Sequence, residues 1–576
     1  YKMSTQYFDG SNNLMNPNLP AGIVTVESVA TDDGMGNETV YSYTYKDGEF
    51  YYDNPFDKQL TGFGLVTKTD TEGNVTKTYF HQGNETASTT GEYDDHISKA
   101  GRPYRIEQYD DSSNLYSKTI NKWDRYDRGS GASFVKLAQS VEFSYDGDSD
   151  HKEKAASYSY NNTTGQLLDT KEWGVVSGSN DGTFSDSGTD DFTTSYNYAT
   201  STATSTIDFH KVSRETTVDN GSNKVREQYT YYDELSLGSM DEGNPTKMEQ
   251  WVSGSTYIDI ERAYNSYGLV TSSKDPRDNT TTYSYDTNNL YPATTTNPLS
   301  QSATYTYDYA TGQVEMAIDP NGNQTRKLYD PLGRVASISQ FDPTLAPGTL
   351  ATTTAYTYTD NNFPRQVKTT NYLNSATTTE SYTYYDGLSR EIETRTKAEE
   401  SGKYAVNDFF YDNRGLMESQ SLPYFASGTA YTGTTTAPAS TLLTTYQYDA
   451  LGRVATASTS VGITTSSYDD WATTVTDALD NSKIYTHDAY GNLTSVVENN
   501  GASAYTTTYT YSGNKKLTKI TDAEANVRNF TYDGLGRRLT AQDLHDAADG
   551  TYGTWTYEYD SAGNIGTTTD PKSQVV

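Results

Sequence analysis

One acidic segment carries side chains that could bind a cation. Asp146, Asp148 and Asp150 stand at the first, third and fifth ligand positions of a calcium-binding loop. His151 stands where such a loop needs its turn glycine, and Ser157 stands where it needs a bidentate glutamate. We therefore interpret this segment as a solvated acidic turn rather than a calcium site.

The histidines do not form a recognisable metal-binding motif. No two of them stand at the spacing of metal ligands, so we predict neither a metal nor a cofactor site. His487 replaces the tyrosine of a repeat described below, and we expect it to fill that aromatic position. We expect His81 to pack or hydrogen-bond locally. The six histidines are His81, His96, His151, His210, His487 and His545.

The sequence does not favour an enzyme. The nucleophile elbow of hydrolases, the phosphate-binding loop and the dinucleotide fingerprint do not occur in usable form. Carboxylate pairs suited to glycoside hydrolysis decide nothing in a chain with 76 Asp and Glu residues. An enzyme acting on carbohydrate would need a unique cleft with a carboxylate pair of perturbed pKa. We predict a non-catalytic protein with no catalytic residue.

A phrase of the form Tyr-Asp-x-Leu-Gly-Arg recurs in the second half of the chain. Looser copies beginning at Tyr264, Tyr285, Tyr307 and Tyr329 follow one another at intervals of 21, 22 and 22 residues. A motif present many times must serve something that every repeat does, and here that is making a turn. The predicted structural turn residues are Tyr329, Asp330, Gly333 and Arg334; Tyr448, Asp449, Gly452 and Arg453; Tyr532, Asp533, Gly536 and Arg537; and Tyr559, Asp560 and Gly563.

A second phrase lies about half a period away, as in Asp319-Pro320-Asn321-Gly322-Asn323. In both phrases Asp can bond its own backbone two residues on, Gly or Asn supplies a positive φ, and Pro fixes a turn position. We therefore expect positive φ at Gly333, Gly452 and Gly536. The arginine after the glycine should pair with a neighbouring Asp across the sheet rather than form a binding ladder.

The segments between the turns alternate like strands. Tyr41 to Tyr45 and Tyr505 to Tyr511 place rings on one face and hydroxyls on the other, with the period of two that is typical of strands. No long segment has apolar residues at helical spacing. The tracts from Phe341 to Thr354 and from Ser421 to Thr441 exceed hairpin length and are interpreted as surface loops or changes of direction. The pattern predicts an all-β fold, a long antiparallel meander of short hairpins.

Composition supports a sheet with partly wet faces. The 576 residues include 53 Tyr but only 16 Phe, and a Tyr ring buries apolar area while its hydroxyl reaches water or a partner. The mean hydropathy of −0.80 is low, but the placed β-branched and aromatic residues argue against disorder. The net charge of −33 opposes binding to nucleic acid or to an anionic membrane. Because no apolar run approaches about 18 residues, we predict no membrane span.

The Tyr-Asp phrases resemble the YD repeats of the RHS/YD-repeat family, which includes bacterial Rhs proteins, Tc-toxin B and C components and animal teneurins. Leu60 to Val66, followed by Asp70 to Asn74 and Thr78 to Gly83, is similar to the junction at which Tc-toxin B-type proteins enter their repeat shell. On this basis we expect a lead-in and junction at 1–84, divergent YD-like β-repeats at 85–262 and regular repeats at 263–576. Both ends look cut from a longer chain.

The resemblance implies an antiparallel strip that spirals into a hollow shell and encloses a C-terminal effector. The family's C-terminal signature and self-cleavage region are absent here, so we expect shell wall without cargo or protease. The implied partners are that effector or a partner shell subunit, and self-association or a cell-surface glycan are further candidates. We expect an exported protein, secreted or at the cell surface. The alternative is an extracellular adhesion or filament-forming protein.

Overall fold

The protein is almost entirely β-structure. The computed structural model describes residues 1–83, 88–129, 131–201, 211–342, 349–374, 377–433, 443–501 and 503–575. Within these ranges the helices are single 3₁₀ turns, namely η1 (Ser4–Gln6), η2 (Ser88–Thr90) and η3 (Ile97–Lys99). The prediction of an all-β antiparallel fold is confirmed. In the described part of the chain, no helix has both the length and the apolar character needed to cross a membrane.

The strands have the following bounds. The first group is β1 (Lys2–Met3), β2 (Val24–Thr25), β3 (Ser28–Asp32), β4 (Glu38–Asn54), β5 (Asp57–Thr69), β6 (Val75–Phe80), β7 (Pro103–Tyr109), β8 (Leu115–Gly129), β9 (Ala132–Ser144), β10 (Lys152–Tyr160), β11 (Leu167–Gly178), β12 (Phe184–Asp186), β13 (Phe192–Tyr198), β14 (Thr200–Ser201), β15 (Val212–Asp219), β16 (Lys224–Tyr232), β17 (Ser239–Met240), β18 (Pro245–Ser253) and β19 (Thr256–Tyr264). The second group is β20 (Val270–Lys274), β21 (Thr280–Tyr285), β22 (Pro292–Thr296), β23 (Ser302–Asp308), β24 (Gln313–Ile318), β25 (Gln324–Tyr329), β26 (Val335–Phe341), β27 (Leu350–Thr359), β28 (Arg365–Tyr372), β29 (Thr378–Tyr385), β30 (Glu391–Lys397), β31 (Lys403–Tyr411), β32 (Met417–Ser421) and β33 (Tyr424–Ser427). The third group is β34 (Leu443–Tyr448), β35 (Val454–Thr459), β36 (Gly462–Asp469), β37 (Ala472–Thr476), β38 (Ser482–His487), β39 (Leu493–Asn500), β40 (Ser503–Tyr511), β41 (Leu517–Thr521), β42 (Asn526–Tyr532), β43 (Arg538–Gln542), β44 (His545–Asp546), β45 (Thr554–Tyr559) and β46 (Ile565–Thr569).

Antiparallel pairing runs along the chain as one continuous strip from β3 to β46. Three short strands pair beside this line: β12 on β11, β33 on β31 and β44 on β42. The register shifts where a repeat tyrosine enters its turn, so that Tyr329 faces Val335 although Leu328 faces Ser337. Such bulges bend and twist a strand pair, which favours a curved strip.

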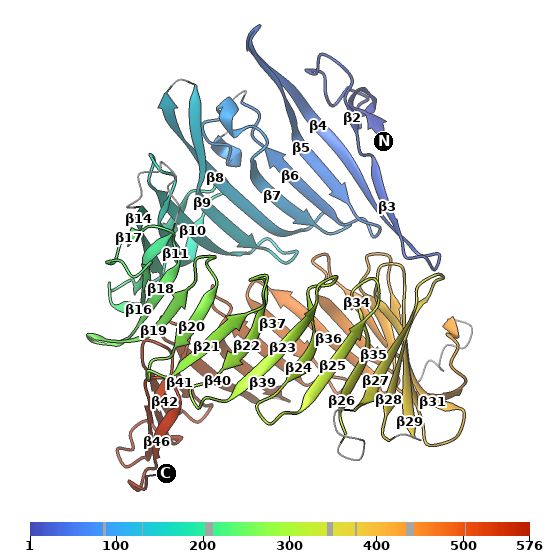
Figure 1. The fold of residues 1–576 in the computed structure, drawn as a ribbon. Coiled ribbons are helices and arrows are strands. Elements are labelled where there is room, and N and C mark those ends of the chain that lie inside the picture. The colour runs from blue at the N-terminus through green and yellow to red at the C-terminus, as the bar shows by residue number, and fades with distance from the viewer. Residues whose placement is uncertain are drawn as a thin grey trace.

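The strip curves round and comes to lie beside itself. Strands β3 to β11 form the upper part of the molecule, and β18 to β41 run round the lower part, green in front, yellow at the right and orange behind (Figure 1). The sheet therefore surrounds a central space like a barrel. However, β3 pairs with β4 and β46 pairs with β45, and no pairing in the described residues joins these two ends. Closure is made by contacts between turns, described below.

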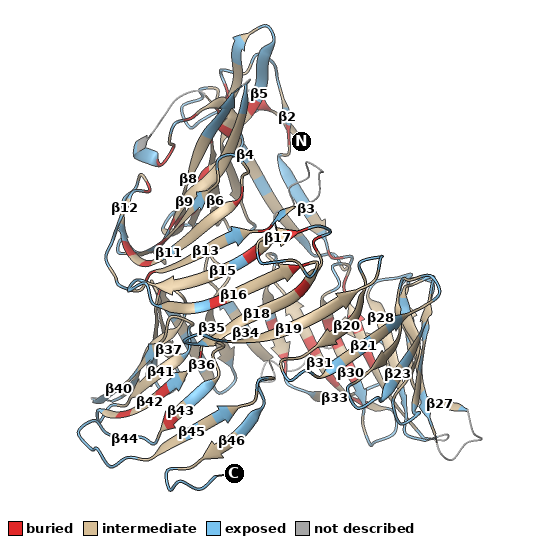
Figure 2. Ribbon diagram, turned by 60° about the vertical axis from the view of Figure 1, so that its left-hand side comes forward, coloured by how far each residue is buried: buried red, intermediate tan, exposed pale blue. Residues whose placement is uncertain are grey.

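The curved sheet, which forms the wall of the molecule, has only a small core shielded from water. The accessible surface is 31184 Å², whereas a compact protein of this mass has about 20,000 Å². Most strand residues are half-buried, and the buried ones gather in a few places (Figure 2). The largest buried groups are Ile120, Val141, Phe143, Ala155 and Val176 in one cluster and Tyr382, Tyr384, Ile392, Tyr404 and Val406 in another. Most of the sheet thus presents both of its faces to solvent.

Two tracts interpreted as loops contain strands. Strand β27 begins at Leu350, inside the first tract, and β33 lies at Tyr424–Ser427, inside the second. The Ala, Pro and Gly residues of these tracts do not prevent strand formation, because threonine is a good strand former and β33 pairs with β31. Residues 343–348 and 434–442 of these tracts lie outside the described residues.

Candidate functional site: the repeat turns and the seam between coils

Each repeat turn is closed by backbone bonds and by its aspartate. At Asp330 the N–H donates to the carbonyl of Arg334 over 2.8 Å, and the N–H of Gly333 donates to the carbonyl of Asp330 over 2.9 Å. The Asp330 carboxylate accepts the N–H groups of Leu332 and Arg334, both at 2.9 Å. Gly333 has φ of 78°. This is a type I turn followed by a left-handed residue, the usual three-residue hairpin loop.

The other predicted turns repeat this geometry. Asp449 and Asp533 each accept the N–H groups two and four residues further on, at 2.9 to 3.0 Å. The glycines Gly452, Gly536 and Gly563 have φ of 79°, 78° and 88°. In the last turn Asn564 replaces the arginine and donates its amide to Asp560 over 3.1 Å. This side-chain bond lowers the pKa of Asp560 below its ordinary value.

In the second phrase the asparagine does not supply the positive φ. In the turn at Asp522, Ala525 has φ of 65° and Asn526 donates its side-chain amide to the Asp522 carboxylate over 2.9 Å. The same division of roles holds where Asp278 or Asp480 precedes the asparagine, with φ of 65° and 62°. Asn follows the left-handed position because its amide reaches the turn carboxylate, as the arginine does in the first phrase.

The repeat tyrosines tie each hairpin to the one before it. The hydroxyls of Tyr329, Tyr448 and Tyr559 donate to the carbonyls of Val314, Met417 and Arg538, at 2.6, 2.7 and 2.9 Å. Tyr532 occupies the matching place at the bulge between β42 and β43. A phenylalanine cannot make this bond, which gives a structural reason for the excess of Tyr over Phe.

The repeat arginines bind first within their own turn. The Nε atoms of Arg334, Arg453 and Arg537 donate to the aspartate four residues earlier, at 2.8, 2.6 and 2.6 Å. The predicted pairing with an Asp of a neighbouring turn occurs only as a second contact. Arg334, for example, also pairs with Asp360 at 2.8 Å. The short turn places the guanidinium on its own carboxylate before any other group.

The same guanidinium groups stack on the tyrosine of the next repeat. Arg334 lies 3.9 Å above the Tyr358 ring centroid, and Arg453 lies 4.0 Å above that of Tyr468. Such cation–π contacts link successive hairpins along one edge of the strip.

Turns far apart in the sequence meet where the strip lies beside itself. The N–H of Gly387 donates to the carbonyl of Asp33, and the Arg390 guanidinium lies 3.5 Å from the Asp33 carboxylate. Further along, the Arg414 guanidinium lies 3.2 Å from the carboxylate of Glu72. We call the round of the strip that begins at β3 the first coil, and the round that lies beside it the second coil. Both contacts join turns of the second coil to turns at the start of the first coil.

Further contacts follow in the same order along the sequence of each coil. Arg453 lies 2.9 Å from Asp146, and the Tyr490 hydroxyl donates to the carbonyl of Asp190 over 2.6 Å. The Asp146 carboxylate is therefore buried against an arginine, so the interpretation as a solvated turn is wrong for Asp146, because Arg453 is remote in the sequence, whereas Asp148 and Asp150 are exposed. The burial raises the pKa of Asp146, although Arg453 opposes the shift.

Two further contacts complete the line. The N–H of Gly534 donates to the carbonyl of Val252 over 2.6 Å, and Arg277 lies 3.1 Å from the carboxylate of Asp560. We name the line of contacts from Asp33–Gly387 to Arg277–Asp560 the inter-coil seam. Repeat turns thus perform two tasks, since they reverse the chain and also join one coil to the next.

Two glycines missed by the sequence analysis mark close approach at the seam. A Cβ atom on Gly387 would lie 2.6 Å from the carbonyl oxygen of Asp33, and one on Gly534 would lie 2.3 Å from the Trp251 ring. Both stand directly after the aspartate of a Tyr-Asp-Gly-Leu phrase, where other copies carry Pro331 or Ala450. A glycine at this position of the phrase is the sequence signal that could have identified both places of close approach.

Comparison with known proteins agrees with this geometry. Residues 1–88 match the family described as the insecticide toxin TcdB middle/N-terminal region. The crystal structure of TcdB2-TccC3-Cdc42 matches with a TM-score of 0.78 and 13% identity over 98% of this chain and 41% of that chain. The crystal structure of TcdB2-TccC3 gives 0.78 and 14% over 97% and 39%, respectively. The Tc holotoxin pore of Photorhabdus luminescens gives 0.75 and 13% over 96% and 40%.

The chain has the fold of these toxin structures. The resemblance to the repeat shell of Tc-toxin B-type components, expected from the sequence, is confirmed. The chain spans about two fifths of the length of the chains it matches. A comparison with curated protein sequences gives no match.

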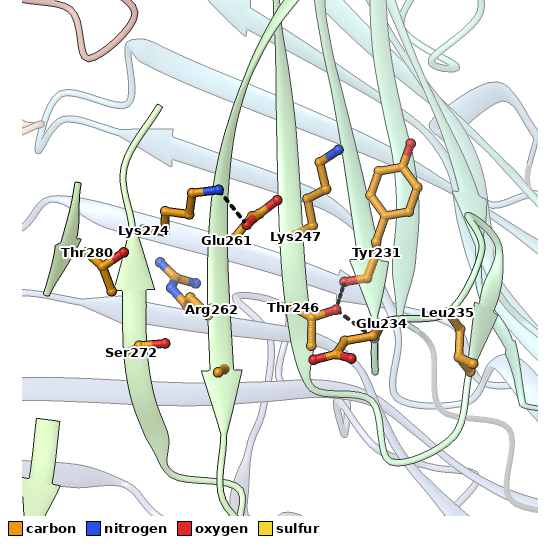
Figure 3. A pocket seen from close by; sticks show the side chains of 11 residues that line it. Tyr231, Glu234, Leu235, Thr246, Lys247, Glu261, Arg262, Ser272, Lys274 and Thr280 are labelled. Atoms are coloured by element: carbon orange, nitrogen blue, oxygen red, sulfur yellow. Dashed lines mark hydrogen bonds and ion pairs between the residues drawn. The ribbon is translucent and has the colours of Figure 1, made fainter. Parts of the chain in front are cut away.

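A shallow pocket lies on one face of this toxin-like sheet, across β16, β18, β19, β20 and β21 (Figure 3). Its two lysines are engaged in ion pairs: Lys274 lies 3.3 Å from Glu261, and Lys247 lies 2.7 Å from Glu249. The hydrogen bond with Glu249 raises the pKa of Lys247, and those with Asp278 and Glu261 raise the pKa of Lys274. The pocket is therefore lined in part by ion-paired side chains of the sheet surface.

A buried carboxylate pair lies under the β33 branch. Glu393 and Asp408 face one another beside Arg395, whose Nη1 and Nη2 donate to the Gly428 carbonyl and the Thr432 hydroxyl, at 3.1 and 2.8 Å. Burial raises the pKa of Asp408 to about 6. Because Glu393 and Arg395 are fully buried, this pair offers no access to a substrate, and we interpret it as structural.

The histidines are spread over the chain. His487 donates its backbone N–H to the carbonyl of Trp471 at the tyrosine position of its repeat, while His151 and His545 stack on Tyr145 and Tyr552. The Nδ1 atom of His81 lies 2.9 Å from Oδ1 of Asp95, as expected for a local hydrogen bond. His96 contacts Arg125 through Nε2 over 2.9 Å. His210 lies outside the described residues.

Proposed function

We propose that the chain is a non-catalytic wall segment of a hollow β-shell in an exported bacterial toxin-type protein of the RHS/YD-repeat kind. The shell would enclose a C-terminal effector that this chain does not contain, and the partner would be that effector or a further shell subunit. The observation that carries the proposal is the inter-coil seam, because it turns a curved strip into a continuous wall.

The faces of the wall support an aqueous interior. The accessible surface of 31184 Å² exceeds that of a compact protein by about half. A filled centre would bury one face of nearly every strand, whereas most strand residues here remain half-exposed.

The relatives support an effector partner. The matching structures are described as TcdB2 together with TccC3, one of them with Cdc42 in addition. For the present chain we infer a partner of the same kind, a polypeptide that completes the wall or is enclosed by it. We infer export by the same analogy, since a toxin-type shell acts outside the cell that makes it.

Protease protection tests enclosure. The chain is co-expressed with the proposed effector-bearing polypeptide, and the intact assembly is digested with a protease too large to enter a shell. We expect the effector to resist while a Gly534→Leu variant, which opens the seam, loses that protection. Gly10→Leu is the matched control, because a Cβ on Gly10 has no atom within 4 Å. Equal cleavage of the effector in wild type and Gly534→Leu would reject enclosure.

A further inference from the structure

Lys118, on β8, is a buried lysine that forms no ion pair with any described residue. The residue is only 4% exposed. Its Nζ atom donates instead to two neutral groups, the Tyr145 hydroxyl over 2.8 Å and the Oδ1 atom of Asn180 over 3.3 Å. A buried ammonium without an ion pair is costly, and the neutral amine avoids that cost.

The surroundings of this amine favour its neutral form. The Nζ atom lies 4.0 Å from the centroid of the Phe143 ring, at the edge of the largest buried cluster of the first coil. Burial, followed by the nearby Arg105 cation, lowers the pKa of Lys118 to about 8, whereas Glu107 and Glu153 oppose the shift. About a tenth of the amine is then unprotonated at pH 7, far more than for an ordinary lysine. A desolvated, neutral lysine is a nucleophile.

Asn180 is held beside this amine by the connection between β11 and β12. Its backbone carbonyl accepts from Arg105 Nη1 over 3.2 Å, and its Nδ2 atom donates to the carbonyl of Thr89 over 3.5 Å. The carboxamide carbon is one bond away from Oδ1, so a small rotation of the Asn180 side chain brings it to about 3–3.5 Å from the amine, the distance at which a nucleophile attacks. The residue as a whole is exposed, so a small product can leave.

The Tyr145 hydroxyl provides a route for a proton. It accepts from Lys118 Nζ, and within the described ranges it has no other hydrogen-bond partner. Burial raises the pKa of Tyr145, so the hydroxyl keeps its own proton at neutral pH. It can therefore give that proton to a departing nitrogen while it takes one from the attacking amine.

We propose that the side chains of Lys118 and Asn180 join in an intramolecular isopeptide bond. The Lys118 Nζ atom forms a bond to the Asn180 Cγ atom, and the bond from Cγ to Nδ2 breaks. The amine loses one proton, which passes through Tyr145 to the departing nitrogen, so that ammonia leaves. Nothing is oxidised or reduced, and no further reactant is needed. The bond fastens the connection between β11 and β12 to β8, 62 residues away in the sequence.

The intact mass and the peptide map of the purified chain test the bond. We expect the wild type to be lighter than its sequence by one ammonia and to yield two peptides joined through Lys118 and Asn180. Asn180→Ala should have the full mass of its own sequence and a lower unfolding temperature, because the cross-link restricts the unfolded chain. Tyr145→Phe keeps the ring, and in freshly made protein it should form the bond at least tenfold more slowly.

The same peptide map contains a matched control. Lys136 Nζ donates to Asn162 Oδ1 over 2.6 Å, but this contact lies at the surface, where the amine stays hydrated and protonated, so the pair should remain unlinked. A wild-type chain with the full mass of its sequence would overturn the proposal. Loss of ammonia within a single peptide, with Lys118 free, would overturn it as well, since an asparagine that cyclises on its own backbone also releases ammonia.

Discussion

At the residue scale, the aspartate of each repeat turn is the most connected group. Asp330 accepts two backbone N–H groups and the guanidinium of Arg334, and the arginine in turn stacks on Tyr358. A carboxylate with several donors organises a turn that glycine alone would leave loose. The left-handed position is separate from this network, which is why Gly452 and Ala525 can both occupy it.

That separation predicts opposite effects of two substitutions. Gly452→Ala should lower the free energy of unfolding by about 1 kcal/mol, because alanine disfavours positive φ. The added methyl has room, since its nearest neighbour would be Leu416 at 3.6 Å. Ala525→Gly should raise the free energy of unfolding by about 1 kcal/mol for the same reason. Denaturant titration measures both, and a change of the same sign in the two variants would refute the backbone argument.

Asp408 should give the protein an unusual pH dependence. Its pKa of about 6 in the folded state, raised chiefly by burial, exceeds the unfolded value of about 3.9. The folded state therefore binds more protons between these values, so this group's contribution to stability falls as pH rises from about 4 through 6. The groups facing it are Glu393, Arg395 and Tyr424.

Asp408→Asn imitates the protonated form and isolates this contribution. The variant should be more stable than the wild type at pH 7, and the difference should shrink as the pH is lowered to 5. Thermal unfolding of both proteins across this range measures the difference. A gap that stays constant or widens on acidification would contradict the assigned pKa.

At the element scale, the inter-coil seam decides how hairpins become a wall. Its contacts join turns such as Asp33 and Gly387, or Val252 and Gly534, which lie hundreds of residues apart. Backbone bonds at two of these places require close approach, so a side chain there must force the coils apart. Hairpin formation is local, whereas seam formation depends on the curvature of the whole strip.

Gly534→Ala should therefore open the seam locally without breaking its hairpin. Gly534 does not have a positive φ, so the turn itself tolerates alanine, but the new methyl would clash with Trp251. We expect a loss of about 1–3 kcal/mol, as for overpacking elsewhere. Hydrogen exchange should quicken at Gly534 and Trp251 and stay unchanged at Gly333. Exchange that stays slow at Gly534 would count against the seam bond.

The strands and turns could be predicted from the sequence better than their arrangement in space. The Tyr-Asp phrases and the alternation of Tyr with Thr placed the turns at Asp330, Asp449 and Asp533, because both signals are local. Pairing of Arg453 with Asp146 was out of reach, since it depends on how far the strip curves in one round. The contact of Lys118 with Asn180 depends on how the connection between β11 and β12 folds back over β8 and has no periodic signal.

At the scale of the whole molecule, the protein is a wall rather than a globule. A single sheet with both faces half-exposed has too little dry core to explain its order by core packing alone. Order comes instead from backbone pairing, from tyrosine and arginine links between hairpins, and from the inter-coil seam. This arrangement suits a shell, because strength lies within the wall and the enclosed space stays free.

A cryo-EM map of the purified chain, at a resolution that separates strands, tests this account most directly. The account predicts one strip whose second coil lies against the first, with Gly534 beside Trp251, around a solvent-filled interior. A map in which two faces of the sheet pack together over a filled centre, or in which copies stack into a helical fibre without the seam, would contradict it.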